Sequence, residues 1–264
     1  MKKQLHLFFT ALLFYTRIPC PKHIDHHPDS LNKPSRYFPL IGWIVGFIFF
    51  GIFYLSSLLF DTNIAIVLAL IASILTTGAF HEDGFADVCD GFGGGWTKEK
   101  ILHIMKDSAI GAYGAIGLVL LFLLKFTVLL QLFSISSQLN NAFLILALLC
   151  ISGHSISRLA AISIVFTHQY VREDALSKSK PIAQHYSWKE VAGAFFFGLV
   201  PLCILAFFEW KMLLVLLPIW ITRSYLAHYF TKWIGGYTGD CLGATQQVCE
   251  IIFYLSVIGL WKFI

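Results

Sequence analysis

The chain has 264 residues, of which 57% are hydrophobic and only 13% are charged, and its formal net charge is +4. A soluble domain has about twice this charged fraction, so the composition excludes an ordinary soluble protein and indicates an integral membrane protein. Six cysteines without a C-x-x-C pair argue against a zinc site or a disulfide framework. Because no basic run is interleaved with aromatic residues, no nucleic-acid partner is expected.

The first apolar stretch, residues 4–18, is too short to span a bilayer, and we expect it to form an interfacial or re-entrant helix. No A-x-A-like site follows it, so a cleavable signal peptide is not expected. The sequence predicts an all-α integral membrane protein, a polytopic bundle of about seven transmembrane helices in a single domain over residues 1–264. The expected spans lie near residues 38–60, 64–80, 110–133, 142–166, 191–208, 212–229 and 248–264.

Basic residues gather in one set of the connecting loops. If the N-terminus is cytoplasmic, one side of the membrane holds fourteen of the nineteen Lys and Arg residues, in segments 1–37, 81–109, 167–190 and 230–247. The opposite loops are short and contain Lys211 and Lys262. Positive charge concentrates on the cytoplasmic side of membrane proteins, so this orientation is favoured and the sizeable loops face the cytoplasm.

The stretch FHEDGFADVCDGFGGGW, residues 80–96, follows the second span and carries four carboxylates within nine residues. If it is helical from about residue 80, Asp83, Asp87 and Asp90 share one face, where like charges need a cation to be stable. Carboxylate oxygens suit Mg²⁺ or Mn²⁺. Glu82 is a fourth candidate metal ligand, although it points away from that face. A solvated acidic loop at the membrane boundary is the alternative interpretation.

Glycines directly after these acids, including Gly93 and Gly94, would let backbone N–H groups approach a phosphate. With His81 they are candidate substrate-binding residues. In KDSAIGAYG, residues 106–114, Lys106 is a candidate phosphate ligand and Asp107 a candidate ligand for a metal or a hydroxyl group. A helix N-terminus with a charged pair explains the last two equally well.

A third segment, GGYTGDCLGATQQVCE at residues 235–250, again places glycines and an acid at the expected cytoplasmic boundary. Asp240, Gln247 and Glu250 are candidates to line a polar cavity there. A glycine-rich turn capped by the aspartate is the alternative.

Several charged residues fall inside the expected spans. His154, Ser157 and Arg158 share one helix face by their spacing. Charges at membrane depth usually face the protein interior, so Arg158 and Arg223 are candidates to bind phosphate or to balance the acids, with structural ion pairing as the alternative. Lys125 lies nearer the far side, and we expect it to snorkel to that surface.

Six segments in order along the chain, FYTRIP, RYFPLIGWIVG, HEDGFADVCDGFGGG, IMKDSAIGAYG, SRLAA and GGYTGDCLGA, resemble the cobalamin synthase family of adenosylcobinamide-GDP ribazoletransferases. The family's central motif is similar to H-x-D-G-x-A-D-x-x-D-G, which this chain has from His81 to Gly91. The chain departs from the family pattern at Glu82, a commonly apolar position, and at Ala109, where an arginine or similar residue is expected after KDS.

The resemblance implies transfer of the adenosylcobinamide-phosphate group from adenosylcobinamide-GDP to α-ribazole or its 5′-phosphate, with release of GMP. It also implies dependence on Mg²⁺ and a place in the bacterial inner membrane, surrounded by lipid, with the active site facing the cytoplasm. Asp83, Asp87 and Asp240 are then the predicted catalytic residues, Lys106, Arg158 and Arg223 balance phosphate charge, and a homo-oligomer is a possible assembly.

Two other readings remain open at this point. A CDP-alcohol phosphatidyltransferase-like enzyme has a signature that resembles D-G-x-x-A-R, which the chain matches at Asp83 and Gly84 but not from Asp87 on, and the arginine of the signature is missing. A transporter would use His154, Arg158 and Arg223 as an ion path. The acids gather at one membrane face rather than at mid-depth, which argues against a transporter.

Overall fold

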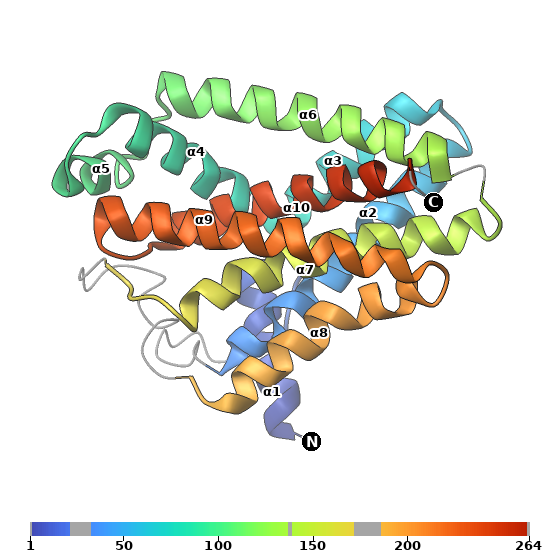
Figure 1. The fold of residues 1–264 in the computed structure, drawn as a ribbon, viewed down its shortest axis with the longest axis horizontal. Coiled ribbons are helices and arrows are strands. Elements are labelled where there is room, and N and C mark those ends of the chain that lie inside the picture. Colours follow the sequence, from blue (N-terminus) through green and yellow to red (C-terminus); the bar gives the residue numbers. More distant parts are fainter. Residues whose placement is uncertain (1, 22–32, 137–138, 172–185, 263–264) are drawn as a thin grey trace.

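The computed structural model describes residues 2–21, 33–136, 139–171 and 186–262, and the described chain is helical apart from short connections and one isolated bridge between Tyr170 and Tyr237. Figure 1 labels most of the helices. The elements are α1 (Lys2–Tyr15), η2 (Pro34–Tyr37), α2 (Phe38–Ser57), α3 (Thr62–Thr77), α4 (Phe80–Gly94), α5 (Lys98–Ile104), α6 (Ala112–Ser136), α7 (Ala142–Val165), α8 (Trp188–Ala206), η4 (Trp210–Val215), α9 (Leu216–Ile234) and α10 (Gly239–Trp261).

Within the described residues, six helices are long and apolar enough to cross a membrane, or seven if the bent pair α3 and α4 counts as one span. A helix satisfies its own backbone hydrogen bonds, which the interior of a bilayer requires. The predicted all-α polytopic fold is therefore confirmed. That the whole of residues 1–264 forms one domain stays a prediction, and much of the loop expected at 167–190 lies outside the described residues.

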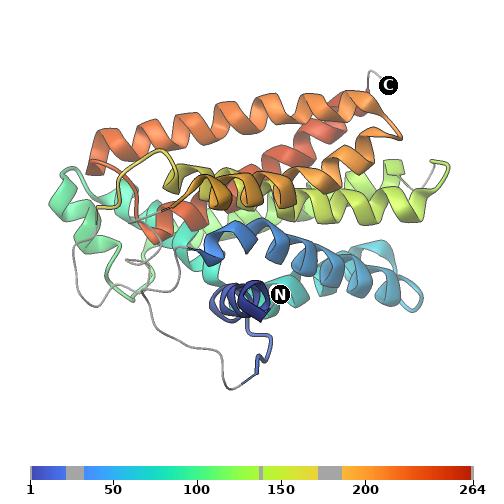
Figure 2. The same cartoon turned by 90° about the horizontal axis from the view of Figure 1, so that it is seen from below.

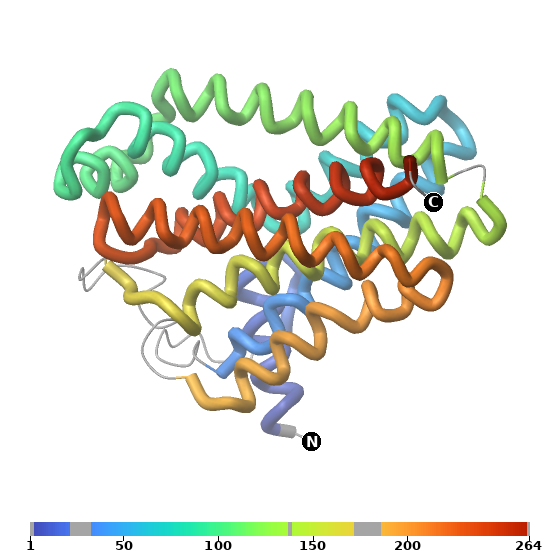
Figure 3. Tube along the Cα trace, in the orientation of Figure 1, coloured from blue at the N-terminus to red at the C-terminus, as the bar shows by residue number. Residues whose placement is uncertain are grey.

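The long helices run lengthwise through the bundle, as the tube in Figure 3 traces. Helices α7 and α10 lie at its centre, with 72% and 78% of their most apolar windows buried, against 33% for α6. Helix α2 packs closely on α7. Gly42 makes this possible, because a Cβ at that position would lie 2.5 Å from the backbone oxygen of His154. The short helix α1 lies across this direction and is seen end-on in Figure 2.

Helix α3 ends at a sharp corner, where the axis of α4 turns by 89°. Gly78 and Ala79 both adopt left-handed backbone conformations there, with φ of 66° and 58°. Arg17 lies over this corner: its backbone N–H donates to Thr76 O at 2.7 Å, and its side chain occupies the space that a Cβ on Gly78 would need. The acidic stretch therefore leaves the direction of α3 and forms a separate helix.

The start of the last helix differs from the sequence-based expectation. Helix α10 begins at Gly239 rather than near residue 248, and the Thr238 hydroxyl caps it by accepting the backbone N–H of Cys241 at 3.3 Å. The polar residues 239–247 suggested a loop at the membrane boundary. They are helical because most of them pack inside the protein, where their polar groups face other helices rather than lipid.

Candidate functional site

The acidic residues of α4 meet the N-terminus of α10 at a close helix crossing. A Cβ on Gly84 would lie 2.9 Å from the Cα of Asp240, so the two backbones approach without room for a side chain. Asp83 and Asp87 flank this contact on α4, one helical turn apart; Asp83 is exposed, whereas Asp87 and Asp240 are half-buried. The three predicted catalytic acids thus come from distant parts of the chain and lie at one helix crossing.

Asp90, the third aspartate of the motif, is buried and contacts α6 rather than α10. Its Oδ2 accepts the backbone N–H of Gly111 and its Oδ1 accepts that of Gly114, both at 2.8 Å. These amides lie at the start of α6, where backbone N–H groups have no partner within the helix. Asp90 therefore caps α6, with both carboxylate oxygens engaged in the fold.

Gly93 and Gly94 lie within the last turn of α4 rather than in an open loop. A Cβ on Gly93 would lie 2.6 Å from the ring of Tyr113, and the side chain of Met105 fills the space beside Gly91. The absence of side chains lets the segment between α5 and α6 lie close against α4. Gly91 and Gly93 are therefore positions of close packing, whereas Gly94 is exposed and keeps only an ordinary contact with Ile104.

Lys106 and Asp107 are both exposed in the connection between α5 and α6. The Asp107 carboxylate accepts the backbone N–H of Ala109 at 3.1 Å. This connection joins α5 at the same end of the bundle as the C-terminal part of α4, as Figure 1 shows. Both side chains are thus exposed at the end of the bundle where α4 ends.

Arg223, predicted to bind substrate, is buried against the end of α7. Its Nε donates to Ser163 Oγ at 2.8 Å and its Nη2 to Ser163 O at 2.7 Å, with a further bond to the Thr167 hydroxyl. The guanidinium also lies 5.1 Å from the ring centre of Trp220. These hydrogen bonds join α9 to the end of α7, so the guanidinium stabilises the packing of these two helices.

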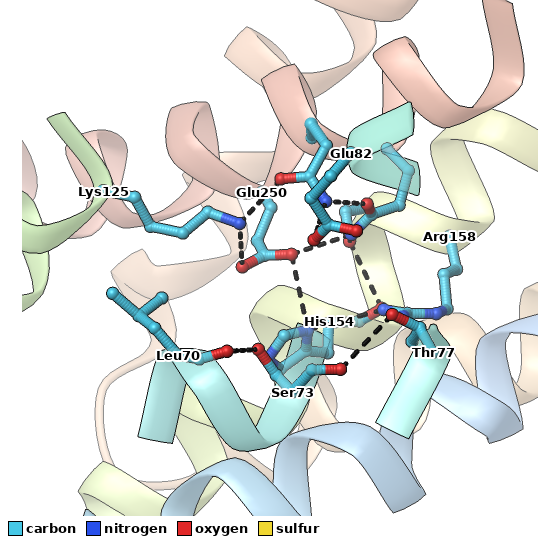
Figure 4. Close-up of polar contacts among 11 residues, drawn as sticks. Leu70, Ser73, Thr77, Glu82, Lys125, His154, Arg158 and Glu250 are labelled. Atoms are coloured by element: carbon cyan, nitrogen blue, oxygen red, sulfur yellow. Dashed lines mark hydrogen bonds and ion pairs between the residues drawn. The ribbon is translucent and has the colours of Figure 1, made fainter. Parts of the chain in front are cut away.

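A buried polar network lies deeper in the bundle, among α4, α6, α7 and α10 (Figure 4). Glu250 is its centre: Oε1 lies 3.0 Å from Lys125 Nζ, and Oε2 lies 3.3 Å from His154 Nδ1 and accepts Gln246 Nε2 at 2.7 Å. Two acids and two permanent cations balance in formal charge, which lowers the large cost of burying them in a membrane protein. We call this set the interior network; its members are Glu82, Lys125, His154, Arg158, Gln246, Gln247 and Glu250.

Gln247 connects the acidic helix to this network. Its Nε2 donates to Glu82 Oε1 at 2.9 Å and its Oε1 accepts Lys125 Nζ at 2.8 Å. Lys125 is 4% exposed, so the expectation that it snorkels to the far surface is wrong. Its ammonium turns inward because Glu250 and Gln247 both accept from it, and these partners replace the water that it would otherwise seek.

Arg158 and His81, two predicted substrate-binding residues, are also interior. Arg158 is 1% exposed; its Nη1 donates to His154 O at 2.9 Å, and the guanidinium lies 5.8 Å from the ring centre of Phe38, on which His81 stacks. Both line a cavity of about 10 Å³ with Glu82 and other network residues. That space suits at most a single water, so the cavity is no substrate pocket.

Four buried atoms on residues that line this cavity make no hydrogen bond within the described chain: His81 Nε2, Glu82 Oε2, His154 Nε2 and Arg158 Nε.

The sequence-based predictions gave Glu250 and Gln247 only a minor role in the site, as possible lining of a polar cavity, and gave Lys125 no role there. The available signal was a lysine inside one span and the polar residues Gln246, Gln247 and Glu250 on adjacent turns of another, since polar residues at such depth usually find one another.

The acids at the crossing offer carboxylate oxygens, the type of ligand that Mg²⁺ prefers. The described residues hold no group of three or more His, Cys, Asp or Glu side chains arranged to bind a metal. Mg²⁺ usually takes one or two carboxylates and completes its shell with water and substrate phosphates. Asp83 and Asp87, exposed and half-buried on adjacent turns, therefore fit this ion together with a phosphate substrate, whereas Glu82 faces the interior network.

Comparisons with known proteins agree with one another. The chain is 47% identical over 263 residues to the adenosylcobinamide-GDP ribazoletransferase of Shewanella amazonensis, covering 99% of this chain and 98% of that protein. It is 45% identical over 262 residues to the protein of the same name from Shewanella frigidimarina, covering 98% and 96%. No solved structure matches the chain. Because the family model for cobalamin-5-phosphate synthase matches residues 7–258, the chain belongs to the cobalamin-5-phosphate synthase family.

Proposed function

We propose that this protein is a Mg²⁺-dependent adenosylcobinamide-GDP ribazoletransferase. The family membership and the names of the relatives support the reaction, and the meeting of Asp83, Asp87 and Asp240 at the Gly84 crossing supports its place in the molecule. In the proposed reaction, the ribose 3′-hydroxyl of α-ribazole, or of its 5′-phosphate, attacks the phosphorus linked to cobinamide. The new P–O bond forms as the bond to the GMP oxygen breaks, and GMP leaves.

Each acid at the crossing has a distinct proposed task. Asp83 and Asp87 would hold the magnesium ion against the pyrophosphate, and bound Mg²⁺ neutralises the phosphate charge that repels an attacking oxygen. Asp240 would orient the ribose hydroxyl and accept its proton at a carboxylate oxygen. Lys106, exposed at the same end of the bundle, would contact a phosphate oxygen. The buried His81, Arg158 and Arg223 are assigned to the fold.

The proposed location is the bacterial inner membrane, with the acids facing the cytoplasm. The connection between α5 and α6 and the turn before α10 lie at the bundle end to which α4 leads (Figure 1). Both belong to the set of segments with fourteen of the nineteen basic residues. The positive-inside rule supports a cytoplasmic position of that end, where a nucleotide-linked substrate is available.

Turnover by membranes that contain the protein tests this proposal. Adenosylcobinamide-GDP and α-ribazole are supplied with Mg²⁺ or with EDTA, and GMP and the corrinoid product are measured by mass spectrometry. We expect both products with Mg²⁺ and neither with EDTA. A parallel reaction with a CDP-alcohol donor tests the other enzyme class: turnover of that donor, without turnover of adenosylcobinamide-GDP, would overturn the proposal.

A further inference from the structure

The interior network reaches the acidic helix through one side chain, Glu82, which directly precedes Asp83. Successive side chains around an α-helix are separated by about 100°, so an inward Glu82 places Asp83 about 100° and Asp87 about 140° away from the network. The rotation of α4 about its axis therefore decides whether Asp83 and Asp87 face Asp240 and solvent. A contact that holds Glu82 inward also sets the direction of the two acids.

Chain continuity alone does not fix this rotation. The corner at Gly78 and Ala79 separates α4 from α3, so α4 does not inherit the orientation of a straight transmembrane helix. At the α10 crossing, Gly84 offers a smooth backbone surface without an interlocking side chain. Besides the Asp90 cap near its far end and the stack of His81 on Phe38 beside the corner, the rotation of α4 depends on the contact that holds Glu82.

Gln247 supplies such a contact, and its partners allow only one orientation of its side-chain amide. Lys125 can only donate and a carboxylate of Glu82 accepts, so the amide oxygen of Gln247 must face Lys125 while its nitrogen faces Glu82. The same nitrogen also donates to Gln246 Oε1 at 3.0 Å. Loss of this amide would leave Glu82, which is 8% exposed, without its described hydrogen-bond partner.

We propose that Gln247 is a positioning residue: by holding Glu82 toward the interior network, it fixes the rotation of α4 and thereby directs Asp83 and Asp87 toward Asp240. This inference rests on the proposed function for the task of those acids. Gln247 is 2% exposed and lines the small interior cavity, so its side chain is out of reach of a substrate bound at the crossing. Glu82 acts as an internal tether rather than as a metal ligand.

The test compares Gln247→Met, which keeps the side-chain length and removes the amide, with the control Thr245→Val. Thr245 is buried on the same helix, and within the described residues its hydroxyl donates only to the carbonyl of Cys241 one turn away. One readout is kcat and the Mg²⁺ concentration for half-maximal rate in membranes. The other needs no substrate or metal: the rate at which N-ethylmaleimide labels Cys89, measured by peptide mass mapping.

Cys89 reports the rotation of α4 because it is half-buried on that helix, with its sulfur against Gly117 of α6. For Gln247→Met we expect severalfold faster labelling of Cys89, a higher half-saturating Mg²⁺ concentration, and kcat lowered by about tenfold or more, as small misplacements of reacting groups cause. Thr245→Val should match the wild type in every measurement. If Gln247→Met does not reach the membrane, Gln247→Asn, which shortens the reach but keeps the amide, replaces it.

Wild-type labelling and wild-type kcat in the substituted protein, whether the Met or the Asn variant, would overturn the positioning role. A loss of thermal stability with unchanged kcat and Mg²⁺ response would do the same, since it would indicate packing alone. Failure of the wild-type protein to turn over adenosylcobinamide-GDP would instead overturn the proposed function. The labelling of Cys89 would then still decide whether Gln247 controls the rotation of α4.

Discussion

Lys125 and Glu250 form an ion pair in the centre of the bundle, with 3.0 Å between Nζ and Oε1 and side chains only 4% and 3% exposed. The two residues come from α6 and α10, so the pair joins helices that are distant in sequence. Such a pair contributes little to stability in comparison with a well-packed apolar pair, but removal of one partner leaves the other charge buried and uncompensated.

We therefore expect Lys125→Met to lower the stability of the folded protein by about 3–5 kcal/mol. Thermal unfolding in detergent measures the change. The double variant Lys125→Met/Glu250→Gln removes both charges of the pair and should recover much of the lost stability. A double variant no more stable than Lys125→Met would contradict an electrostatic origin of the effect.

Asp83→Asn should abolish turnover while leaving membrane insertion and thermal stability close to wild type. The side chain is exposed, so its role is expected in the reaction rather than in packing. Rate and Mg²⁺ response are measured in membranes with matched amounts of protein. Glu99→Gln, at an exposed acid in the first turn of α5, is the control. Turnover by Asp83→Asn at the wild-type rate would remove Asp83 from the proposed metal site.

Asp90→Asn should act differently from Asp83→Asn, because Asp90 accepts two backbone amides at the start of α6. An amide side chain has one acceptor oxygen instead of two, so one buried N–H loses its partner, at a cost of about 1–3 kcal/mol. We expect a lower unfolding temperature with a nearly unchanged half-saturating Mg²⁺ concentration. A large change in Mg²⁺ response at unchanged stability would instead identify Asp90 as a metal ligand.

Gly84→Ala should separate α4 from α10, because the added methyl group would lie 2.9 Å from the Cα of Asp240, a backbone atom that cannot turn aside. We expect turnover to fall by about tenfold or more, since the acids would move relative to one another. Gly51→Ala is the matched control: a Cβ there meets nothing within 4 Å, and alanine favours a helix by about 1 kcal/mol over glycine. Equal rates for both variants would contradict the proposed importance of this crossing.

Local sequence patterns predicted much of the fold and part of the site. The apolar stretches predicted the spans, and the spacing of Asp83 and Asp87 was read correctly as helical, since α4 runs from Phe80 to Gly94. Asp240 was expected near these acids on the strength of its glycine-rich surroundings. The structure places it beside Gly84, which the two segments alone did not specify.

The remaining features depend on contacts between distant segments. Lys125 looked like a snorkelling residue because its partner Glu250 lies 125 positions further along the chain and on another helix. Asp90 looked equivalent to Asp83 and Asp87 because helical spacing does not tell which face meets a neighbouring helix terminus. The early start of α10 was hidden because polar residues that face a buried network resemble those of a solvated loop.

The shortness of α3 has a consequence for the surrounding lipid. Its 16 residues extend for about 24 Å, against about 30 Å for the hydrocarbon core of a bilayer. A bilayer accommodates such hydrophobic mismatch by local thinning, which would draw lipid headgroups and water inward beside the corner at Gly78. A large hydrophilic corrinoid nucleotide could then reach the start of α4 from a depression in the membrane surface, without leaving water for the hydrocarbon interior.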